Sequence, residues 1–587
     1  MRVGRRVVDA LRSPRRLGAF AARLGRLIVR GEIGAFVSRI RARGVNADEY
    51  RGWKAARARS STTPVPFLVA IDIDDEVTSR SVAGAFRKRL AQSTPIVARA
   101  GAQWLDECGR APQSLVECVA ASGATWLLWI AAPLELEDDA LPALSEGCAL
   151  PGARVVYADH AIVDESGVET PVFLSAWDRV RIAEAPYTAP MLAVRANLAS
   201  AVEGSRGGAA GQWRFLIDAE NSRSDEHIVH VPRVACRVAR RNDPVADARV
   251  RAAVVPDLDR LAARHGASIA VDGSVSPWLR YRAPSAATVS VVIPTRDRAD
   301  LMTRCIESIL CSGWSARNEL VVVDNGSTDV RVAELLRSLS LRASVRTLRM
   351  DVAFNFPALC NAGVGAAQGS VVVLLNNDAE VSAGWLDELV PLALRSDIGA
   401  VGPLLAYPDG RIQSAGVLVG VNRTATSALE GFDARSPTVA AWCTQRRRVS
   451  ALLGACIAIE RSKYLRIGGM DPQFAVSHNE VDFCLRLDAE GLANVFTPFA
   501  RVLHAEGATR GFEVTAEERL RLDDEEARFV ARWAHLLDVA DPAHHPALAR
   551  TGNPFRLASP ATAVLRARAG WRSVASAASP GIGPSGG

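Results

Sequence analysis

The chain has 587 residues, more than one hydrophobic core usually organises, so we expect two or more domains. Its composition, 49% hydrophobic and 23% charged, is typical of folded globular proteins, and its longest apolar run, 124–136, is too short to cross a bilayer. The net charge of +6 is uneven, since residues 1–60 carry +12 and the remainder −6. Ten scattered cysteines without a C-x-x-C pair argue against a zinc knuckle or a disulfide framework.

Residues 1–60 form a basic arm that we expect to contain an amphipathic helix. Apolar residues recur there at helical spacing, and arginines fall on the opposite side: Leu17, Phe20, Leu24, Leu27, Ile28; Arg16, Arg23, Arg26, Arg30. Such a helix suits an anionic membrane surface, and packing on its own protein is the alternative. No aromatic residues interleave with the basic ones, so we expect no nucleic-acid partner. No segment resembles a signal peptide, which predicts a cytoplasmic protein, free or peripheral on the inner face of the cytoplasmic membrane.

Two α/β regions are expected after this arm. Strand-like and helix-like segments alternate over residues 66–245, beginning with a strand at Phe67–Ile71. Residues 246–287, which include a helical stretch near 247–265, are predicted to connect the two regions. From Val289 the alternation becomes regular. Apolar, β-branched strands are predicted at 289–293, 320–324, 345–350 and 370–375, and helices at 301–310, 330–339 and 357–367. This pattern predicts a doubly wound sheet covered by helices on both faces.

Three polar loops follow successive strands of the predicted sheet. They are PTRDR (Pro294–Arg298), DNGSTD (Asp324–Asp329) and NND (Asn376–Asp378). Any one of them could be an ordinary turn, but the carboxyl ends of parallel strands meet in one crevice, where such sheets bind ligands. Asp378 offers a hard divalent cation an oxygen ligand, and a cation on a departing diphosphate lowers the reaction barrier.

These loops belong to a set of motifs that resembles family 2 glycosyltransferases with a GT-A fold. The motifs VSVVIPTRDR, VVVDNGSTD, LLNNDAEV, GGMDPQF and NEVDFCLRL occur in that family's order from Val289 to about Gly511. They look especially like the large bacterial surface-polysaccharide members, often called rhamnosyltransferase-like. The resemblance implies a catalytic domain over 288–512 and a C-terminal helical extension with a disordered tail over 513–587.

The resemblance also implies roles for individual residues. Asp324 is expected to bind the nucleobase, and the other nucleotide-binding candidates are Pro294, Thr295, Arg298, Asn325, Asn361 and Asn377. Asp378 and His504 are the expected ligands of Mg²⁺ or Mn²⁺. Glu480 is the expected general base that deprotonates the acceptor hydroxyl, because that step needs a positioned, ionised carboxylate. The alternatives are purely structural: His504 could be a histidine at a strand end that only makes hydrogen bonds within the protein, and Glu480 could only stabilise the N-terminus of its helix through the helix dipole.

Some positions depart from the family's pattern. Glu480 stands where Asp is usual, and Ala505, Ser414 and Ser427 stand where relatives often carry histidine. Residues 66–245 resemble a degenerate copy of the same GT-A domain, and we expect it to be inactive. In WLLWIAAPLEL, residues 129–132 occupy the place of the acidic metal motif, and GQWRFLI (211–217) lacks an acidic pair.

The leading hypothesis is an inverting, metal-dependent glycosyltransferase that uses a UDP- or dTDP-linked sugar. Its acceptor would be a hydroxyl of a bacterial surface glycan or lipid-linked glycan. A non-catalytic scaffold for glycan assembly is the first alternative, supported by the departures at Glu480 and Ala505. A nucleotidyltransferase-like sugar activator is the second, but PTRDRADL lacks the glycines of a triphosphate-binding loop.

Overall fold

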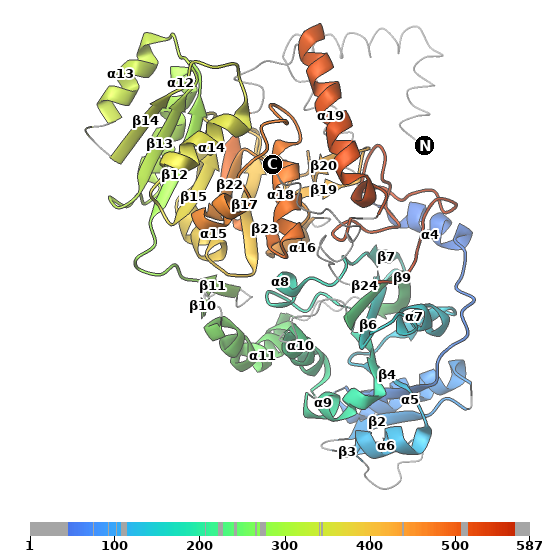
Figure 1. Ribbon diagram of the computed structural model, residues 1–587. Coiled ribbons are helices and arrows are strands. Elements are labelled where there is room, and N and C mark those ends of the chain that lie inside the picture. Colours follow the sequence, from blue (N-terminus) through green and yellow to red (C-terminus); the bar gives the residue numbers. More distant parts are fainter. Residues whose placement is uncertain are drawn as a thin grey trace, which may run out of the picture.

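The computed structural model describes residues 45–569, apart from short gaps (Figure 1). The gaps are 74, 92, 101–102, 107–113, 189, 206, 221–226, 240–243, 265–266, 271–277, 340, 342–343, 437–438, 506–514 and 540. The apolar and basic series predicted between residues 16 and 30 therefore lies outside the described residues. Among those described, no helix is both long enough and apolar enough to cross a membrane.

The second half of the chain is built on one large mixed sheet. Its strands run in the order β14 (Ser344–Arg349), β13 (Glu319–Asp324), β12 (Val289–Thr295), β15 (Val371–Leu375), β22 (Cys456–Glu460), β17 (Ile398–Ala406), β23 (Ala493–His504) and β16 (Ala379–Val381). The first four strands are parallel, as the sequence predicts, and β22 then pairs antiparallel with β15. Strands β12, β13 and β15 are buried throughout, which explains their continuous apolar character.

Helices cover both faces of this sheet. They are α12 (Ala299–Cys311), α13 (Val330–Leu339), α14 (Phe356–Ala366), α15 (Trp385–Ala393), α17 (Arg461–Arg466) and α18 (Asn479–Ala489). Side chains of α12 and α15 pack with Val291 and Ile293 on one face, and those of α14 and α18 pack with Val292 on the other. Helix α14 lies very close to β12, because a Cβ added to Gly363 would come within 2.3 Å of the Val292 side chain.

Smaller elements complete this half. They are β18 (Ile412–Ser414), β19 (Val417–Val419), β20 (Ala425–Ser427), α16 (Ala440–Cys443) and β21 (Arg447–Val449). Strand β18 pairs with β17, β21 pairs with β23, and β19 and β20 form a separate hairpin.

The first half contains a second sheet with a closely related strand order. It runs β3 (Gln103–Asp106), β2 (Ile96–Ala100), β1 (Phe67–Ile71), β4 (Trp126–Ile130), β8 (Met191–Arg195), β6 (Val155–Val163), β9 (Ile228–Ala239) and β24 (Arg568–Ala569). From β2 to β9, each neighbouring pair has the same relative direction as its counterpart from β13 to β23. Even the side strands correspond, since β7 (Glu169–Val172) pairs with β6 and β5 (Glu135–Leu136) pairs with β9. The molecule is thus a GT-A sheet preceded by an additional domain of similar topology.

The helices of the first half come before, between and after these strands. They are α4 (Ala47–Ala56), α5 (Glu76–Arg89), α6 (Leu115–Ser122), α7 (Ala140–Cys148), α8 (Arg179–Ile182), η1 (Ala196–Leu198), α9 (Ala199–Gly204), α10 (Gly208–Glu220) and α11 (Pro244–Arg264). The region predicted as a connection, 246–287, contains most of α11 and a hairpin of β10 (Ala267–Ala270) and β11 (Trp278–Tyr281).

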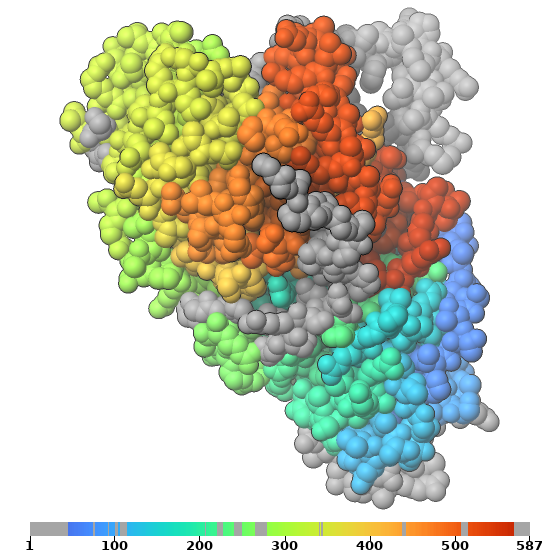
Figure 2. Space-filling model, in the orientation of Figure 1, coloured from blue at the N-terminus to red at the C-terminus, as the bar shows by residue number. Residues whose placement is uncertain are grey.

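The two halves are joined by buried polar contacts and by the C-terminal segment. Arg446, only 1% exposed, pairs with Glu184 of the first half at 2.7 Å and with Glu388 of the second at 2.6 Å. After α19 (Ala516–Leu537), the chain crosses to the first half, where β24 pairs with the edge of β9. Figure 2 shows this orange-red segment extending from the second half toward the blue and cyan surface of the first.

Candidate active site

The three polar loops predicted to converge do lie together at one edge of the second sheet. The amide of Asn377 donates to the Thr295 hydroxyl at 2.9 Å, which joins the loops after β15 and β12. The Asp297 carboxylate accepts the backbone N–H groups of Thr328 at 2.7 Å and Asp329 at 2.8 Å, which joins the loops after β12 and β13. These bonds form because β12 lies between β13 and β15, so all three strands end at the same edge.

Asp324 and Asn325 line this edge at the end of β13. Asp324 is 5% exposed, and its carboxylate accepts the backbone N–H of Ser327 at 2.9 Å and the Arg349 guanidinium at 3.0 Å. The amide nitrogen of Asn325 donates to the carbonyls of Met350 and Val352. Its Oδ1 is buried without a hydrogen-bond partner among the described residues. An unpaired buried acceptor is costly, so this atom suits a ligand's N–H donor.

Arg298 lies beside the loop that carries Asp378. Its guanidinium is partly exposed and binds Asp300 through two contacts of 3.2 Å. The pKa of Arg298 is raised above its ordinary value, first by the hydrogen bond to Asp300 and also by the charge of Asp378. The guanidinium is therefore within electrostatic reach of the predicted metal ligand.

Asn361 has a different environment from the other nucleotide-binding candidates. Its Oδ1 accepts the Tyr464 hydroxyl at 2.6 Å and the Met470 N–H at 3.0 Å, while its Nδ2 donates to the Met470 carbonyl at 2.8 Å. These bonds tie α14 to the GGMD segment. The described contacts of this amide are thus with protein groups.

Asp378 and His504 form a buried pair at the end of β15. Asp378 Oδ1 lies 3.1 Å from His504 Nε2, and the two residues are 9% and 7% exposed. Strand pairing brings them together, because Ala379 of β16 is the register partner of His504 in β23. His504 Nδ1 lies 3.0 Å from Gln413 Oε1 and donates to it in the tautomer that leaves Nε2 as an acceptor, and the Asn376 amide nitrogen lies 3.2 Å from that Nε2.

Glu480 is the second residue of α18 and is half-buried beside the same loop. A Cβ added to Gly454 would lie 3.5 Å from the Glu480 Cβ and 3.7 Å from its carboxyl carbon. The carbonyl of the next residue, Ala455, accepts the backbone N–H of Asn376 at 3.0 Å. The carboxylate of Glu480 thus stands next to the strand that borders the Asp378 loop.

Sequence reasoning missed two partners of these residues. Arg349 ends β14 and is the register partner of Asp324, so a basic residue at the end of the neighbouring predicted strand was the available signal. Gln413 directly precedes Ser414, one of the positions noted for its lack of histidine. Its contact with His504 depends on the antiparallel pairing of β18 with β17, which no local sequence pattern predicts.

The first half lacks these groups at the corresponding strand ends. Strand β4 ends at Ile130 and is followed by Ala131 and Ala132, where β15 is followed by Asn376–Asp378. The carboxylate of Asp72, which follows β1 at this edge, is buried and binds the Arg99 guanidinium and the Trp129 indole N–H. Because Asp72 is fully buried and already paired, it is not an open metal ligand.

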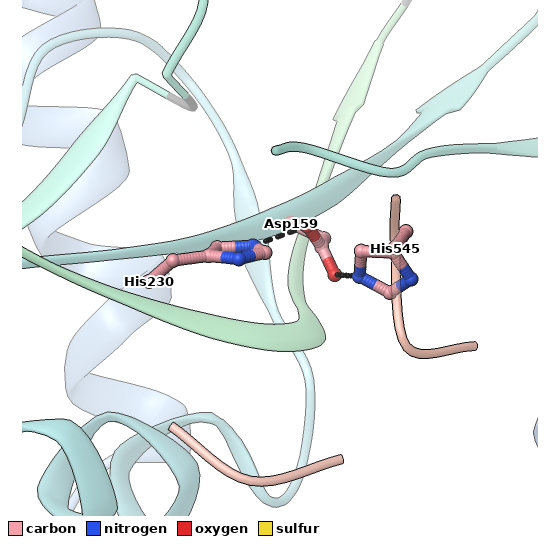
Figure 3. A group of neighbouring side chains, drawn as sticks. All are labelled: Asp159, His230 and His545. Atoms are coloured by element: carbon pink, nitrogen blue, oxygen red, sulfur yellow. Dashed lines mark hydrogen bonds and ion pairs between the residues drawn. The ribbon is translucent and has the colours of Figure 1, made fainter. Parts of the chain in front are cut away.

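A separate cluster of Asp159, His230 and His545 has the residue types of a metal site (Figure 3). Asp159 lies between the imidazoles, with Oδ1 2.8 Å from His230 Nε2 and Oδ2 2.7 Å from His545 Nε2. Each outer ring nitrogen, Nδ1, faces an N–H donor, from Arg568 in one case and from Ala547 in the other. Both Nε2 atoms therefore carry protons and donate to the carboxylate.

This cluster is a hydrogen-bonded staple between the first half and the C-terminal segment. All its members are buried, and Asp159 also accepts the Leu174 N–H at 2.9 Å. Burial raises the pKa of Asp159, but the interactions with His545 and His230 outweigh it and hold that pKa below the ordinary range. Burial lowers the pKa of His230 to about 4, so this imidazole is neutral near pH 7. The neighbouring Arg568 guanidinium adds a positive charge, which disfavours a cation here.

The staple predicts a loss of stability in mild acid. The unfolded chain binds a proton at His230 below its ordinary pKa of about 6.5, whereas the folded chain does so only near 4. The free energy of unfolding should therefore fall as the pH drops from about 6.5 to about 4, by about 3 kcal/mol for His230 alone. Urea unfolding at pH 7 and pH 5 measures this. His230→Gln should flatten the slope and His227→Gln, on a half-exposed ring, should not. An unfolding midpoint that is equal at both pH values would contradict the prediction.

Comparisons with known proteins identify a family for part of this chain. Residues 290–461 match the family model "Glycosyl transferase family 2". The chain is 34% identical over 432 residues to an uncharacterised protein, y4gI, of Sinorhizobium fredii, covering 70% of this chain and 47% of that one. It is 31% identical to the O-antigen biosynthesis protein RfbC of Myxococcus xanthus, covering 69% of this chain and 32% of that one. The chain thus spans less than half the length of these two relatives.

A shorter sequence match and two solved structures also align with this chain. An N-acetylglucosaminyl-diphospho-decaprenol L-rhamnosyltransferase of Mycobacterium tuberculosis is 29% identical over 33% of this chain and 68% of its own. Solved structures of GalNAc-T7 and of a mannosyltransferase from Pyrobaculum calidifontis align with TM-scores of 0.36 and 0.34, at 18% and 17% identity. They cover 43% and 52% of this chain, and 49% and 78% of their own. Taken with the motifs and the sheet, the family match assigns residues 290–461 to the family 2 glycosyltransferases of the bacterial polysaccharide type, with the GT-A fold that the motifs predict.

Proposed function

We propose that the second half of the chain is an inverting, metal-dependent glycosyltransferase that transfers a sugar from a nucleoside diphosphate to a glycan hydroxyl. The observation that carries the proposal is the buried Asp378–His504 pair, with Glu480 standing beside the same loop. The pair offers ligands for a cation at the leaving diphosphate, and Glu480 offers a base for the acceptor.

The chemistry of the pair fits Mg²⁺ or Mn²⁺. A carboxylate oxygen and an imidazole nitrogen 3.1 Å apart could both bind one cation, which would replace the Asn376 amide as the partner of that nitrogen. Ligands about 2.1 Å from an octahedral ion and at right angles to each other are about 3 Å apart. When bound there, the ion would neutralise charge on the departing diphosphate. Arg298 would add a positive charge nearby.

The nucleotide would lie across the ends of β12 and β13. Asp324 is in place to accept a hydrogen bond from the base or ribose, at the expense of its partly exposed partner Arg349. The buried Oδ1 of Asn325 suits the ring N–H of uracil or thymine, which supports a UDP- or dTDP-linked donor. Pro294, Thr295 and Asn377 border the same edge. The amide of Asn361 binds the Met470 carbonyl, so we propose that Asn361 contributes to nucleotide binding through the position of its helix and not through a direct contact of its amide.

Glu480 would remove the proton of the acceptor hydroxyl while that oxygen attacks the sugar. A single base on the side opposite the leaving group gives one in-line displacement and inverts the anomeric centre. We propose no covalent sugar–enzyme intermediate. The names of the relatives support a surface polysaccharide or a lipid-linked glycan as the acceptor class. We further propose that transfer takes place at the cytoplasmic face of the membrane.

A panel of nucleotide sugars tests this proposal. UDP-glucose, UDP-N-acetylglucosamine and dTDP-rhamnose, each with Mn²⁺, should include a donor that raises the melting temperature and releases its nucleoside diphosphate. Removal of Mn²⁺ with EDTA should reduce the release. Stabilisation without release from any donor, even with a lipid-diphosphate sugar acceptor, would favour the scaffold alternative raised by Glu480 and Ala505. We expect residues 66–245 to contribute no transfer of their own.

A further inference from the structure

Helix α19 contacts the segment that carries the proposed base, although it lies beyond the residues that match the family model (Figure 1). Its buried side chains occur at every fourth position: Glu525, Phe529, Trp533 and Leu537. Three of them face residues 474–482, which form the loop before α18 and its first turn. One face of α19 thus packs against the residues on either side of Glu480 in the sequence.

Glu525 makes the most specific of these contacts. It is 2% exposed, and its Oε2 accepts the backbone N–H of Ser477 at 2.7 Å, the Ser477 hydroxyl at 2.9 Å and the Val476 N–H at 3.2 Å. Burying a carboxylate is costly unless donors compensate it, and here the donors belong to a loop without regular structure. The charge of Glu525 therefore fixes the path of the main chain at these two residues.

The fixed loop leads directly into Glu480. The next residue, His478, has a φ of 62°, an unfavourable region for a side chain of this size, and its ring stacks on Phe529 at 4.6 Å. No side-chain hydrogen bond caps α18 at this point. On the far side of Glu480, Asp482 accepts the Trp533 indole N–H at 3.1 Å and Arg532 at 2.8 Å. The base is held from both sides by α19.

We infer that Glu525 is a positioning residue for glycosyl transfer, acting through Ser477 and His478 on the carboxylate of Glu480. The inference rests on the proposed function of Glu480. It makes α19 part of the catalytic unit, whereas the donor side is built by β12, β13 and β15 without it. Loss of the Glu525 charge should therefore impair the chemical step and spare nucleotide binding.

The test compares Glu525→Gln with Glu526→Gln, the neighbouring carboxylate, which makes an ion pair with the exposed Arg423. Glu525→Gln removes the charge, and even when the amide oxygen takes the place of Oε2 the NH₂ group faces the Val476 N–H that Oε1 accepts at 3.3 Å, so the loop should loosen. We expect kcat to fall about 10- to 100-fold, as for a base displaced by about 1 Å. The donor KM and the affinity for UDP or dTDP with Mn²⁺ should stay within about twofold of wild type. Glu526→Gln should match wild type in all these measurements.

Hydrogen exchange of residues 474–482 gives a second measurement that does not need turnover. Exchange there should accelerate in Glu525→Gln alone, with the rest of the second half unchanged. An unchanged exchange rate, or an unchanged kcat despite faster exchange, would overturn the inference. Equal losses of kcat and nucleotide affinity would indicate a general structural role and would overturn it too. A wild-type chain that turns over no donor contradicts the proposed function instead, and the exchange comparison then still decides whether Glu525 fixes the loop.

Discussion

Replacement of Asp378 by Asn is expected to lower transfer by about 10³-fold, the largest effect we anticipate. Asn keeps the size of the side chain and an oxygen, but it loses the charge that a hard divalent cation requires. Cation stabilisation of a leaving diphosphate supplies several kcal/mol, and about 4 kcal/mol corresponds to about 10³-fold. The measurement is the release of nucleoside diphosphate from the donor that the panel identifies.

Binding separates a metal role for Asp378 from a loss of structure. In wild type, UDP or dTDP should raise the melting temperature more with Mn²⁺ than with EDTA, and Asp378→Asn should abolish this difference. The control is Asp387→Asn, an exposed carboxylate in the first turn of α15. It should behave as wild type does. Full activity of Asp378→Asn would refute the metal assignment.

The order of the strands and helices around this site was predictable because each strand can be recognised from its own residues. Strand β1 matches its predicted range, Phe67–Ile71, and α13 matches its predicted range, Val330–Leu339. Continuous β-branched runs such as Val289–Ile293 have few alternatives to a buried strand. The convergence of the three loops followed from the predicted strands, since the carboxyl ends of parallel strands lie at one edge of the sheet.

The remaining features depend on contacts between segments far apart in the chain. His504 meets Asp378 only because β23 pairs with β16, and Glu525 meets Ser477 only because α19 folds back onto α18. The connection predicted at 246–287 contains most of helix α11 (Pro244–Arg264), in agreement with the helical stretch predicted near 247–265, and also the hairpin of β10 and β11. Asp159 contacts His545, which lies 386 positions away in the chain. No local pattern indicates such a pair.

Replacement of Glu480 by Gln should cause the second large loss of activity. Its effects on kcat and on nucleotide binding should differ from those of Asp378→Asn. A general base contributes about 10²- to 10⁴-fold, so kcat should fall within that range. Gln cannot take the proton of an acceptor hydroxyl, yet it preserves the packing against Gly454. Nucleotide affinity and the Mn²⁺-dependent stabilisation should remain, because the Asp324 and Asp378 carboxylates proposed to hold the nucleotide and the cation are unchanged. Glu490→Gln, at the exposed end of the same helix, is the matched control.

The pH dependence of kcat decides between catalysis and helix stabilisation for Glu480. A base that must be ionised makes kcat fall in acid, with a midpoint set by that carboxyl in the enzyme–substrate complex. Glu480→Gln should remove this acid limb from its residual activity. A residue that only favours the start of α18 contributes about 0.3 to 1 kcal/mol, so its loss would lower the melting temperature slightly and leave the limb in place. An acid limb that persists in Glu480→Gln would therefore transfer the role of base to another group.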